Sequence, residues 1–469
     1  MPHAVSSGAL TRRVSAAAVL ALLAGCASVT AGPPPESLDQ TVGNRVPSQA
    51  GGLHSGPDEA AVAAKLDELL RAPLSLEGAV QIGLLNSPKL QAIYAELNIA
   101  RLDVVEAGLL SNPALDVRVR PTFNPAALAT LEFGLVQSFV DLLMRPARKH
   151  LAAAVFEESK LRMAGEVVAY VSDVQTAYFD LQAALNTQQV LADIAESASA
   201  SADLAQRFHE AGNISDLRWK QEVAASEDVA LAVVKQEQDV SDAREALAAL
   251  LGLGMQRAWT VPDILPSPPA KDESIGELEM IALERRLDVA AARQTLQVAL
   301  TALKNKTDWR LWKELNVGVG ADRDSSGQWA VGPEFQVPLP LFNQGRPEVA
   351  RAAAAVQKAQ NDVKATEIRA RTDVRRAAAR LATSRKRIDR YANIILPLKR
   401  DIVALKQQEY NYMFIGAFEV LLAKKDETSA YLSYIESVHV YWRSRAALDG
   451  VLGGGSAAAP VAAVAGGAP

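Results

Sequence analysis

Few residues of this 469-residue chain stand in a pattern that performs chemistry. None of the five histidines lies at ligand spacing from another histidine or a carboxylate in a recognised metal pattern. The six methionines are scattered, and no phosphate-binding loop, nucleophile elbow or GxGxxG string occurs. We therefore predict no catalytic, cofactor-binding or metal-binding site. The single candidate reactive group is the thiol of Cys26, the one cysteine of the sequence.

Cys26 follows a leader that is typical of exported proteins. A basic pair, Arg12 and Arg13, precedes an apolar run of about a dozen residues, which is too short for a permanent membrane helix. The string Leu-Ala-Gly-Cys at 23–26 resembles a bacterial lipobox, in which the thiol takes a diacylglyceryl group and becomes the first mature residue. We predict a signal peptide at 1–25 and lipidation of Cys26. The alternative is a buried free cysteine beside a chance apolar run.

The composition is mildly acidic and rich in alanine. The net charge is −5, and removing residues 1–25, which hold two arginines and no acid, makes it −7. This balance argues against a nucleic-acid partner. Abundant alanine with only 5% aromatic residues favours long, closely packed helices over a thick globular core. After the leader no stretch reaches 18 apolar residues, so we predict no permanent transmembrane helix.

The chain repeats itself in its second half, in the same order of segments. The string "REALAALLG" at 244–252 matches "RAALDGVLG" at 445–453, and "MRPARKHLAAA" at 144–154 lies opposite "GRPEVARAAAA" at 345–355. A proline-rich segment between the copies cannot continue a helix. We predict a lipidated spacer at 26–74, a first repeat at 75–260, a linker at 261–274, a second repeat at 275–453 and a disordered tail at 454–469.

Each repeat contains a pair of alternating segments that is typical of a β-hairpin. We predict hairpins at 113–141 and 315–341, with strands long enough to cross a bilayer at a tilt. Their polar faces are predicted to line a lumen, through Asp116, Arg118, Arg120, Asp322, Glu334 and Gln336. Tryptophans at the hairpin ends are predicted to form interfacial girdles, namely Trp309, Trp312 and Trp329. The alternative is an ordinary small sheet with these tryptophans in its core.

A long helical stretch follows each hairpin. From Pro146 to about Glu210 only one glycine interrupts the pattern, which corresponds to roughly 95 Å of helix. The chain then turns at 209–215 and returns to about residue 251. The second copy runs from Pro347, turns at 412–416 and returns to about residue 452, and Pro397 predicts a kink within it. No compact domain holds such helices, so we predict a coiled-coil-like layer.

Four spanning strands cannot close into a barrel, because open strand edges are not tolerated in hydrocarbon. Known single-chain barrels begin at about eight strands. Several chains must therefore share one barrel, and three chains with four strands each give twelve.

At this point the sequence resembles the TolC-like outer-membrane efflux proteins, over about residues 75–453. The lipobox, the duplicated units and the strings "LEGAVQIGLLNSPKLQA", "VPLPLFNQGRPE" and "EAGNISDL" carry the resemblance. It implies a mainly α homotrimer, with a twelve-stranded outer-membrane β-barrel continuous with a periplasmic α-helical barrel. It implies a lipid-anchored protein of the outer membrane that extends into the periplasm, with an inner-membrane pump and a periplasmic adaptor protein as partners. By the resemblance, Ala27 after the cysteine favours sorting to the outer membrane.

The resemblance also implies that the tips of the helical hairpins close the duct at rest and meet the adaptor. These tips are Gly212, Asn213, Ile214 and Ser215 in the first copy, and Met413, Phe414, Ile415 and Gly416 in the second. The second tip departs from the first, since Met413 stands opposite Gly212. The first repeat also has "LVQSFVDLLMRPARK" where the second keeps "PLPLFNQGR", which predicts a different junction of barrel and helix. Acids near the tips are interpreted as solvated helix faces, namely Glu210, Asp216, Glu409 and Glu419.

The predicted function is that of a passive exit duct of a tripartite efflux system for small toxic solutes or metal ions, and not of an enzyme. Two alternatives stay open at this point. In the first, the same duct serves protein or peptide secretion. In the second, the chain forms no channel and is a periplasmic coiled-coil scaffold or adaptor lipoprotein. An adaptor has one helical hairpin between lipoyl-like β halves, and it lacks duplicated spanning hairpins.

Overall fold

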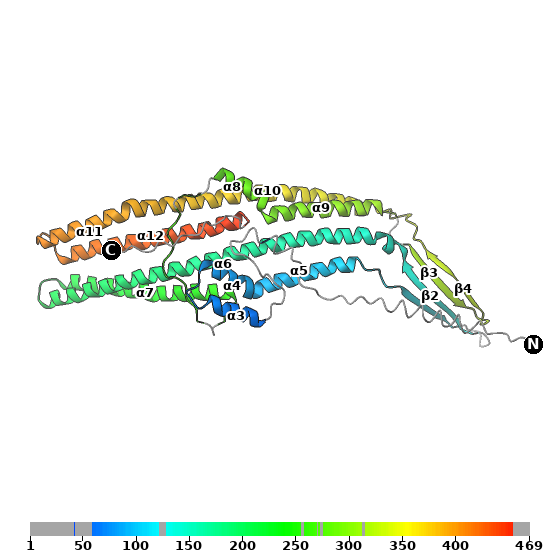
Figure 1. Ribbon diagram of the computed structural model, residues 1–469, viewed down its shortest axis with the longest axis horizontal. Helices are drawn as coiled ribbons and strands as arrows, with labels where there is room; N and C mark the ends of the chain where they lie inside the picture. Colours follow the sequence, from blue (N-terminus) through cyan, green and yellow to red (C-terminus); the bar gives the residue numbers. More distant parts are fainter. Residues whose placement is uncertain are drawn as a thin grey trace, which may run out of the picture.

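The computed structural model describes residue 42 and residues 59–121, 128–254, 258–269, 271–272, 275–311 and 315–453. The described chain is elongated, with four strands at one end and the turns of two helical hairpins at the other (Figure 1). The predicted lipidation site Cys26 and the predicted girdle residue Trp312 lie outside the described residues.

The first half of the chain supplies a group of short helices, one β-hairpin and one long helical hairpin. Its elements are α3 (Glu59–Leu69), α4 (Leu76–Asn86), α5 (Pro88–Ala107), β1 (Ala114–Arg120), β2 (Thr130–Ser138), α6 (Phe139–Glu210) and α7 (Asp216–Leu251). At 72 residues, α6 is roughly 108 Å long.

The second half repeats this order. Its elements are α8 (Ile275–Arg285), α9 (Leu287–Asp308), β3 (Asn316–Arg323), β4 (Trp329–Gln336), α10 (Arg346–Arg390), a π-helical turn (Tyr391–Ile395), α11 (Leu396–Asn411) and α12 (Ala417–Val451). The predicted mainly α fold, built from duplicated helix–hairpin–long-helix units, is confirmed. Among the described helices, none combines the length and the apolar character that crossing a membrane requires.

Serine, proline and glycine set the helix ends. The Ser75 hydroxyl accepts a hydrogen bond from the N–H of Gly78 and so caps α4. Pro88 stands in the first turn of α5, where a missing N–H loses no intrahelical bond. Gly252, with φ of 65°, ends α7 in the left-handed conformation, and the N–H of the next residue reaches back to the carbonyl of Ala248 at 3.0 Å.

The π-helical turn ends two residues before Pro397. The N–H of Leu396 donates to the carbonyl of Tyr391, five residues back. Proline has no N–H, and its ring clashes with the carbonyl four residues earlier in a regular α-helix. The wider π turn relieves that clash, so the chain continues from α10 into α11 without a break.

The long helices lie side by side in a layer whose order is α7, α6, α12 and then α10 with α11 (Figure 1). α6 contacts α7 and α12, and α12 contacts α6, α10 and α11. Neighbouring helices run in opposite directions along this layer. Near the hairpin turns, α7 and α11 are therefore its two edges.

The main core lies at mid-length, where α4 and α5 pack on α6. Two buried tyrosines tie α6 to its neighbours by donating hydrogen bonds to carbonyls: Tyr170 to Leu250 at 2.6 Å, and Tyr178 to Leu74 at 2.9 Å. Burial raises the pKa of both phenols to about 12. Around them lie fully buried apolar side chains, among them Leu90, Leu97, Met163, Leu181 and Leu251.

Residues 258–269 and 271–272 between the repeats form an extended strap. One side chain from each of the four helices of the layer donates a hydrogen bond to a strap carbonyl. The pairs, in chain order along the strap, are Arg244 of α7 with Trp259 (2.9 Å), Gln182 of α6 with Pro262 (3.1 Å), Trp442 of α12 with Pro266 (2.7 Å), and Arg385 of α10 with Pro269. The strap therefore crosses the whole layer and ties its helices together.

The four strands form one antiparallel sheet in the order β1-β2-β3-β4. The two hairpins are joined through β2 and β3, where Phe133 pairs with Ala321 and Gly134 with Gly320. β1 and β4 are the edges of the sheet, and each has one neighbouring strand among the described residues.

Candidate functional site

The sheet has one polar and one apolar face. Directly paired residues of an antiparallel sheet share a face, and alternate residues of a strand do as well. Arg118 pairs with Glu132, Glu132 pairs with Asp322, and the remaining polar positions follow at spacings of two. The register thus brings all six sequence-predicted lumen residues onto one face: Asp116, Arg118, Arg120, Asp322, Glu334 and Gln336.

Charges of both signs are paired on this polar face. Arg118 lies 2.9 Å from Asp116, and Arg120 lies 2.9 Å from Glu132. Glu132 also lies 3.7 Å from Arg118, so it links the two arginines of β1. Glu132 is not among the sequence-predicted lumen residues, although its place in the alternating string "LEFGLVQSF" puts it on the polar side. Because Asp116 and both arginines are exposed and Glu132 is only half-buried, each pair adds little stability, and the face is a hydrated surface.

Glycines keep the middle of the polar face shallow. Gly134 and Gly320 pair with one another, and the Glu334 carboxylate leans over them from β4. A Cβ on Gly134 would lie 3.2 Å from Oε2 of Glu334. The absence of a side chain at Gly134 therefore leaves room for this carboxylate across two strands.

The opposite face of the sheet is apolar and exposed in the single chain. The Trp329 ring stacks on Phe133, with centroids 6.1 Å apart and planes 25° apart, and it is 56% exposed. Trp309 ends α9 at the other end of β3 and is half-buried. Exposed aliphatic side chains cover the rest of the face, among them Leu115, Val117, Val119, Val319 and Val331.

The first hairpin turn ends α6 with a glycine in the left-handed conformation. Gly212 has φ of 73°, and its N–H donates to the carbonyl of His209 at 2.9 Å. The N–H of Asn213 donates to the carbonyl of Phe208 at 2.8 Å. This pair of bonds is a Schellman motif. Ser215 then caps α7 by accepting from the N–H of Arg218 at 3.3 Å.

The second hairpin turn has the same backbone with a different residue. Met413 takes the left-handed position with φ of 60°, and its N–H donates to the carbonyl of Tyr410 at 2.8 Å. The N–H of Phe414 donates to the backbone carbonyl of Glu409 at 2.9 Å. The Met413 side chain is 90% exposed. The Phe414 ring stacks on Tyr412 with centroids 6.0 Å apart. The second turn therefore exposes a large apolar side chain at the left-handed position, whereas the first turn has a glycine there.

Three of the four acids near the turns have an ion-pair partner, and their side chains still lie largely in solvent. Asp216 lies 3.2 Å from both His209 and Lys220 at the first turn. At the second turn, Lys406 lies 3.0 Å from Glu409 and 3.5 Å from Glu419. These carboxylates raise the pKa of Lys406, with the Glu409 hydrogen bond as the main cause. The Lys406 contacts connect the two helices next to the turn.

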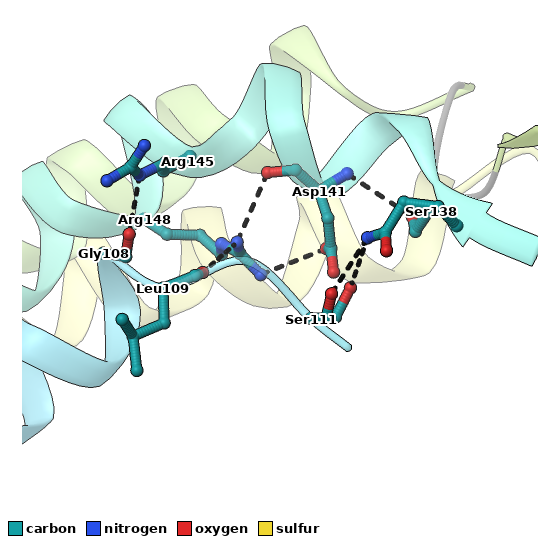
Figure 2. Close-up of polar contacts among 8 residues, drawn as sticks. Gly108, Leu109, Ser111, Ser138, Asp141, Arg145 and Arg148 are labelled. Atoms are coloured by element: carbon teal, nitrogen blue, oxygen red, sulfur yellow. Dashed lines mark hydrogen bonds and ion pairs between the residues drawn. The ribbon is translucent and has the colours of Figure 1, made fainter. Parts of the chain in front are cut away.

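Figure 2 shows the junction between the sheet and the first long helix, where β2 continues directly into α6. Ser138 caps α6 by accepting from the N–H of Asp141 at 3.4 Å. The Asp141 carboxylate lies 3.0 Å from Arg148, which also donates to the carbonyl of Leu109. Arg145 donates to the carbonyl of Gly108 at 2.6 Å. Two arginines of α6 thus hold the end of α5 against the start of α6.

The corresponding junction of the second repeat is a loop. β4 ends at Gln336 and α10 begins at Arg346, after Gly345 with φ of 74°. The loop exposes large apolar side chains, namely Val337, Leu339, Leu341 and Phe342. The two copies therefore connect sheet and helix in different ways, as the departing string of the first repeat predicted.

The sequence profile of the outer membrane efflux protein family matches residues 79–253 and again residues 277–454. The chain belongs to this family. The two matches fall on the two structural repeats, so each repeat of this efflux protein corresponds to one copy of the family's sequence unit.

Relatives and solved structures agree with this membership. The cobalt-zinc-cadmium resistance protein CzcC of Cupriavidus metallidurans is 24% identical over 392 residues, which covers 81% of this chain and 90% of CzcC. The CmeC outer membrane channel of Campylobacter jejuni has a TM-score of 0.67 at 15% identity, covering 81% of this chain and 86% of CmeC. The outer-membrane channel OprN also has a TM-score of 0.67, at 18% identity, covering 84% of this chain and 92% of OprN.

The predicted resemblance to TolC-like outer-membrane efflux proteins is confirmed by these matches, and so is the outer-membrane location. The fold places the two-faced sheet at one end of this efflux protein and the hairpin turns at the other. Within the described part of the chain, no three His, Cys, Asp or Glu residues are grouped so as to hold a metal ion.

Proposed function

We propose that three copies of this efflux protein form one exit duct through the outer membrane. The observation that carries the proposal is the open four-stranded sheet, with an apolar face, a polar face and two edge strands that each have one neighbouring strand among the described residues. A free edge is not stable in hydrocarbon, so β4 of one copy pairs with β1 of the next. Three copies then close a twelve-stranded barrel that continues into a barrel of long helices.

In this barrel the apolar face meets lipid and the polar face lines the lumen. The lumen residues are Asp116, Arg118, Arg120, Asp322, Glu334 and Gln336, to which the geometry adds Glu132. Trp329 sits at one membrane interface and Trp309 at the other, because indole side chains favour the interfacial region. Acyl chains on Cys26 anchor the start of the mature chain in the same membrane.

The hairpin turns are the docking surface for a periplasmic adaptor protein, which joins the duct to an inner-membrane pump. The first surface is Gly212, Asn213, Ile214 and Ser215, and the second is Met413, Phe414, Ile415 and Gly416. The duct itself is passive, and adaptor contacts that differ between the closed and open states shift the tips outward. Small solutes and metal ions are the proposed cargo, supported by a relative named for cobalt, zinc and cadmium resistance.

Conductance of the purified protein in planar lipid bilayers tests this function, together with chemical crosslinking in detergent. We expect crosslinked trimers and stable channel openings. A monomer without conductance contradicts the proposal and favours a scaffold. Uptake of radioactive Zn²⁺ and of a neutral dye by cells that lack the protein tests the cargo, and Cys26→Ala is expected to abolish labelling by palmitate.

A further inference from the structure

The long helix α10 is strongly basic, with 13 basic and 5 acidic residues. Five of its arginines lie along one line of the helix surface and are called here the arginine stripe: Arg351, Arg369, Arg376, Arg380 and Arg387. The first, second and last of them are 18 residues apart, which is five full turns, and the other two lie within about 20° of the same line. All five side chains are exposed, and the stripe is roughly 54 Å long.

The arginine stripe is not neutralised within one copy. None of its five members has an ion-pair partner among the described residues. Three acids of α10 are engaged by other basic residues, in the pairs Lys358–Asp362 (2.7 Å), Arg293–Glu367 (2.7 Å) and Arg286–Asp373 (3.6 Å). Arg376 and Arg380 stand four residues apart, a spacing at which two like charges destabilise a helix. The stripe is therefore a row of uncompensated positive charge.

The arginine stripe lies on the face of the helical layer that points away from the strap. Arg385 marks the strap side of α10, because it donates to the carbonyl of Pro269 and lies 3.2 Å from Asp272. Since an α-helix turns by about 100° per residue, the five arginines are rotated from Arg385 by roughly 140–180°. The stripe and the strap are thus on opposite faces of the layer.

The strap face is the outer face of the proposed duct. Besides the strap it carries the segment before α4, where the N–H of Leu74 donates to the carbonyl of Thr260 at 2.7 Å. A face that is covered by these segments cannot line an open passage, so it lies outside the ring of helices. The arginine stripe then faces the lumen, once in each of the three copies.

The chemistry of arginine indicates which solutes the stripe can hold. A guanidinium donates two parallel hydrogen bonds to one phosphate or carboxylate group. Arg376 and Arg380 are neighbours on the helix surface, with Cβ atoms about 5–6 Å apart, so together they can hold two linked anionic groups. Arg369 and Arg387 follow roughly 10 Å away on either side. This distance is close to the screening length of about 8 Å at physiological salt, so both arginines add to the attraction.

We propose that the arginine stripe binds solutes that carry two or more phosphate or carboxylate groups, with Arg376 and Arg380 at the centre of the site. The inference rests on the proposed trimer and adds a class of cargo to it. Arg387 is the member nearest the hairpin turns and Arg351 the one nearest the sheet. Repeated sites of this kind let an anion pass from one arginine to the next toward the outer membrane.

Conductance of the full-length protein in planar bilayers tests the site, with inorganic pyrophosphate as the probe. Added on the side of the hairpin turns, pyrophosphate is expected to reduce the current at roughly millimolar concentration. Inorganic phosphate offers a single anionic group and is expected to need at least about tenfold more. Arg376→Gln with Arg380→Gln is expected to raise the pyrophosphate concentration for half-block at least about tenfold, because two bidentate contacts are lost.

The matched control removes the same charge from the other face of the same helix. Lys364→Gln with Arg371→Gln changes two exposed residues that lie within roughly 60° of Arg385 on the strap side. Its half-block is expected to stay within about twofold of the unaltered protein, because solvent and salt screen charges on the outer face. Chemical crosslinking measures whether both variants remain trimers, as we expect.

The outcomes separate this inference from the proposed function. A conducting trimer that about 10 mM pyrophosphate does not block, or that phosphate blocks equally well, overturns the site and leaves the duct standing. Equal effects of the two double variants overturn it as well. Loss of the trimer in Arg376→Gln with Arg380→Gln alone also overturns it, because the stripe then lies in a contact between copies. A chain that neither assembles nor conducts refutes the proposed function together with the site.

Discussion

Replacing Met413 by glycine is expected to stabilise the second hairpin turn, whereas replacing Gly212 by alanine is expected to destabilise the first. Both residues hold the left-handed position of a Schellman motif, with φ of 60° and 73°. An L-residue with a Cβ costs roughly 1 kcal/mol in this conformation, and glycine avoids that cost. The second turn therefore retains strain that the first does not have.

The structure isolates this backbone effect from packing. A Cβ on Gly212 meets no atom within 4 Å, and the Met413 side chain is 90% exposed, so neither change alters a core contact. The expected change is about 1 kcal/mol in local opening free energy at each turn, with opposite signs. Since 1.36 kcal/mol corresponds to a factor of ten, amide exchange slows about fivefold in Met413→Gly and quickens about fivefold in Gly212→Ala.

Hydrogen exchange followed by mass spectrometry measures both turns in one experiment, through peptides that span 204–216 and 404–416. Met413→Ala is the matched control, because it removes the same exposed side chain and keeps the left-handed strain; its exchange is expected to stay unchanged. Faster exchange in Met413→Gly, or equal slowing in Met413→Ala and Met413→Gly, would refute the assignment of strain to this backbone position.

Three further predictions concern the core, the sheet and the strap. Burial raises the pKa of Tyr178 to about 12, and an unfolded tyrosine ionises near 10, so the unfolded chain loses this proton first as the pH rises. Stability is therefore full below pH 10 and falls by up to about 2.7 kcal/mol by pH 12, and Tyr178→Phe removes that part of the pH slope in denaturant unfolding. Gly318→Ala places a Cβ 2.6 Å from the carbonyl oxygen of Leu135 and is expected to destabilise the sheet by about 1–3 kcal/mol, measured as its melting temperature by circular dichroism, whereas Gly332→Ala meets no atom within 4 Å and is expected to melt like the unaltered protein. Tyr441→Phe removes the hydrogen bond that its hydroxyl donates to Asp272 at 2.7 Å and is expected to cost about 1–2 kcal/mol, detected as faster proteolysis within the strap; an unchanged cleavage rate contradicts a restraining role for this contact.

The parts of the fold that are visible in the sequence are those with a local signal. Alternation of Leu115, Val117 and Val119 with charged residues marks a strand and also assigns its faces, because a strand has a period of two. The long helices are visible because glycine and proline are nearly absent from them. The equivalence of Met413 and Gly212 follows from the internal repeat alone.

Contacts between distant segments have no such signal. The strap is held by side chains far away in sequence, such as Trp442, whose indole donates to Pro266, 176 residues earlier. The pairing of Lys406 with Glu409 and Glu419 likewise depends on how closely α11 and α12 approach at the turn. A charged residue on an exposed helix face has the same sequence pattern with or without an ion-pair partner, so the sequence does not predict these pairs.

The strap and the π-helical turn divide the helical layer into two regions with unequal restraints. At the strap, each of the four helices is tied by a hydrogen bond to one continuous segment, and Arg385 adds an ion pair with Asp272. The π turn begins at Tyr391, six residues closer to the tip, where the regular hydrogen-bond ladder is interrupted. Beyond it, α11 packs mainly on α12, and its outer face exposes Leu398 and Leu405. Fewer buried contacts and an interrupted ladder lower the free energy of local opening, so amide exchange in the second hairpin is expected to be faster between the π turn and its tip than beside the strap.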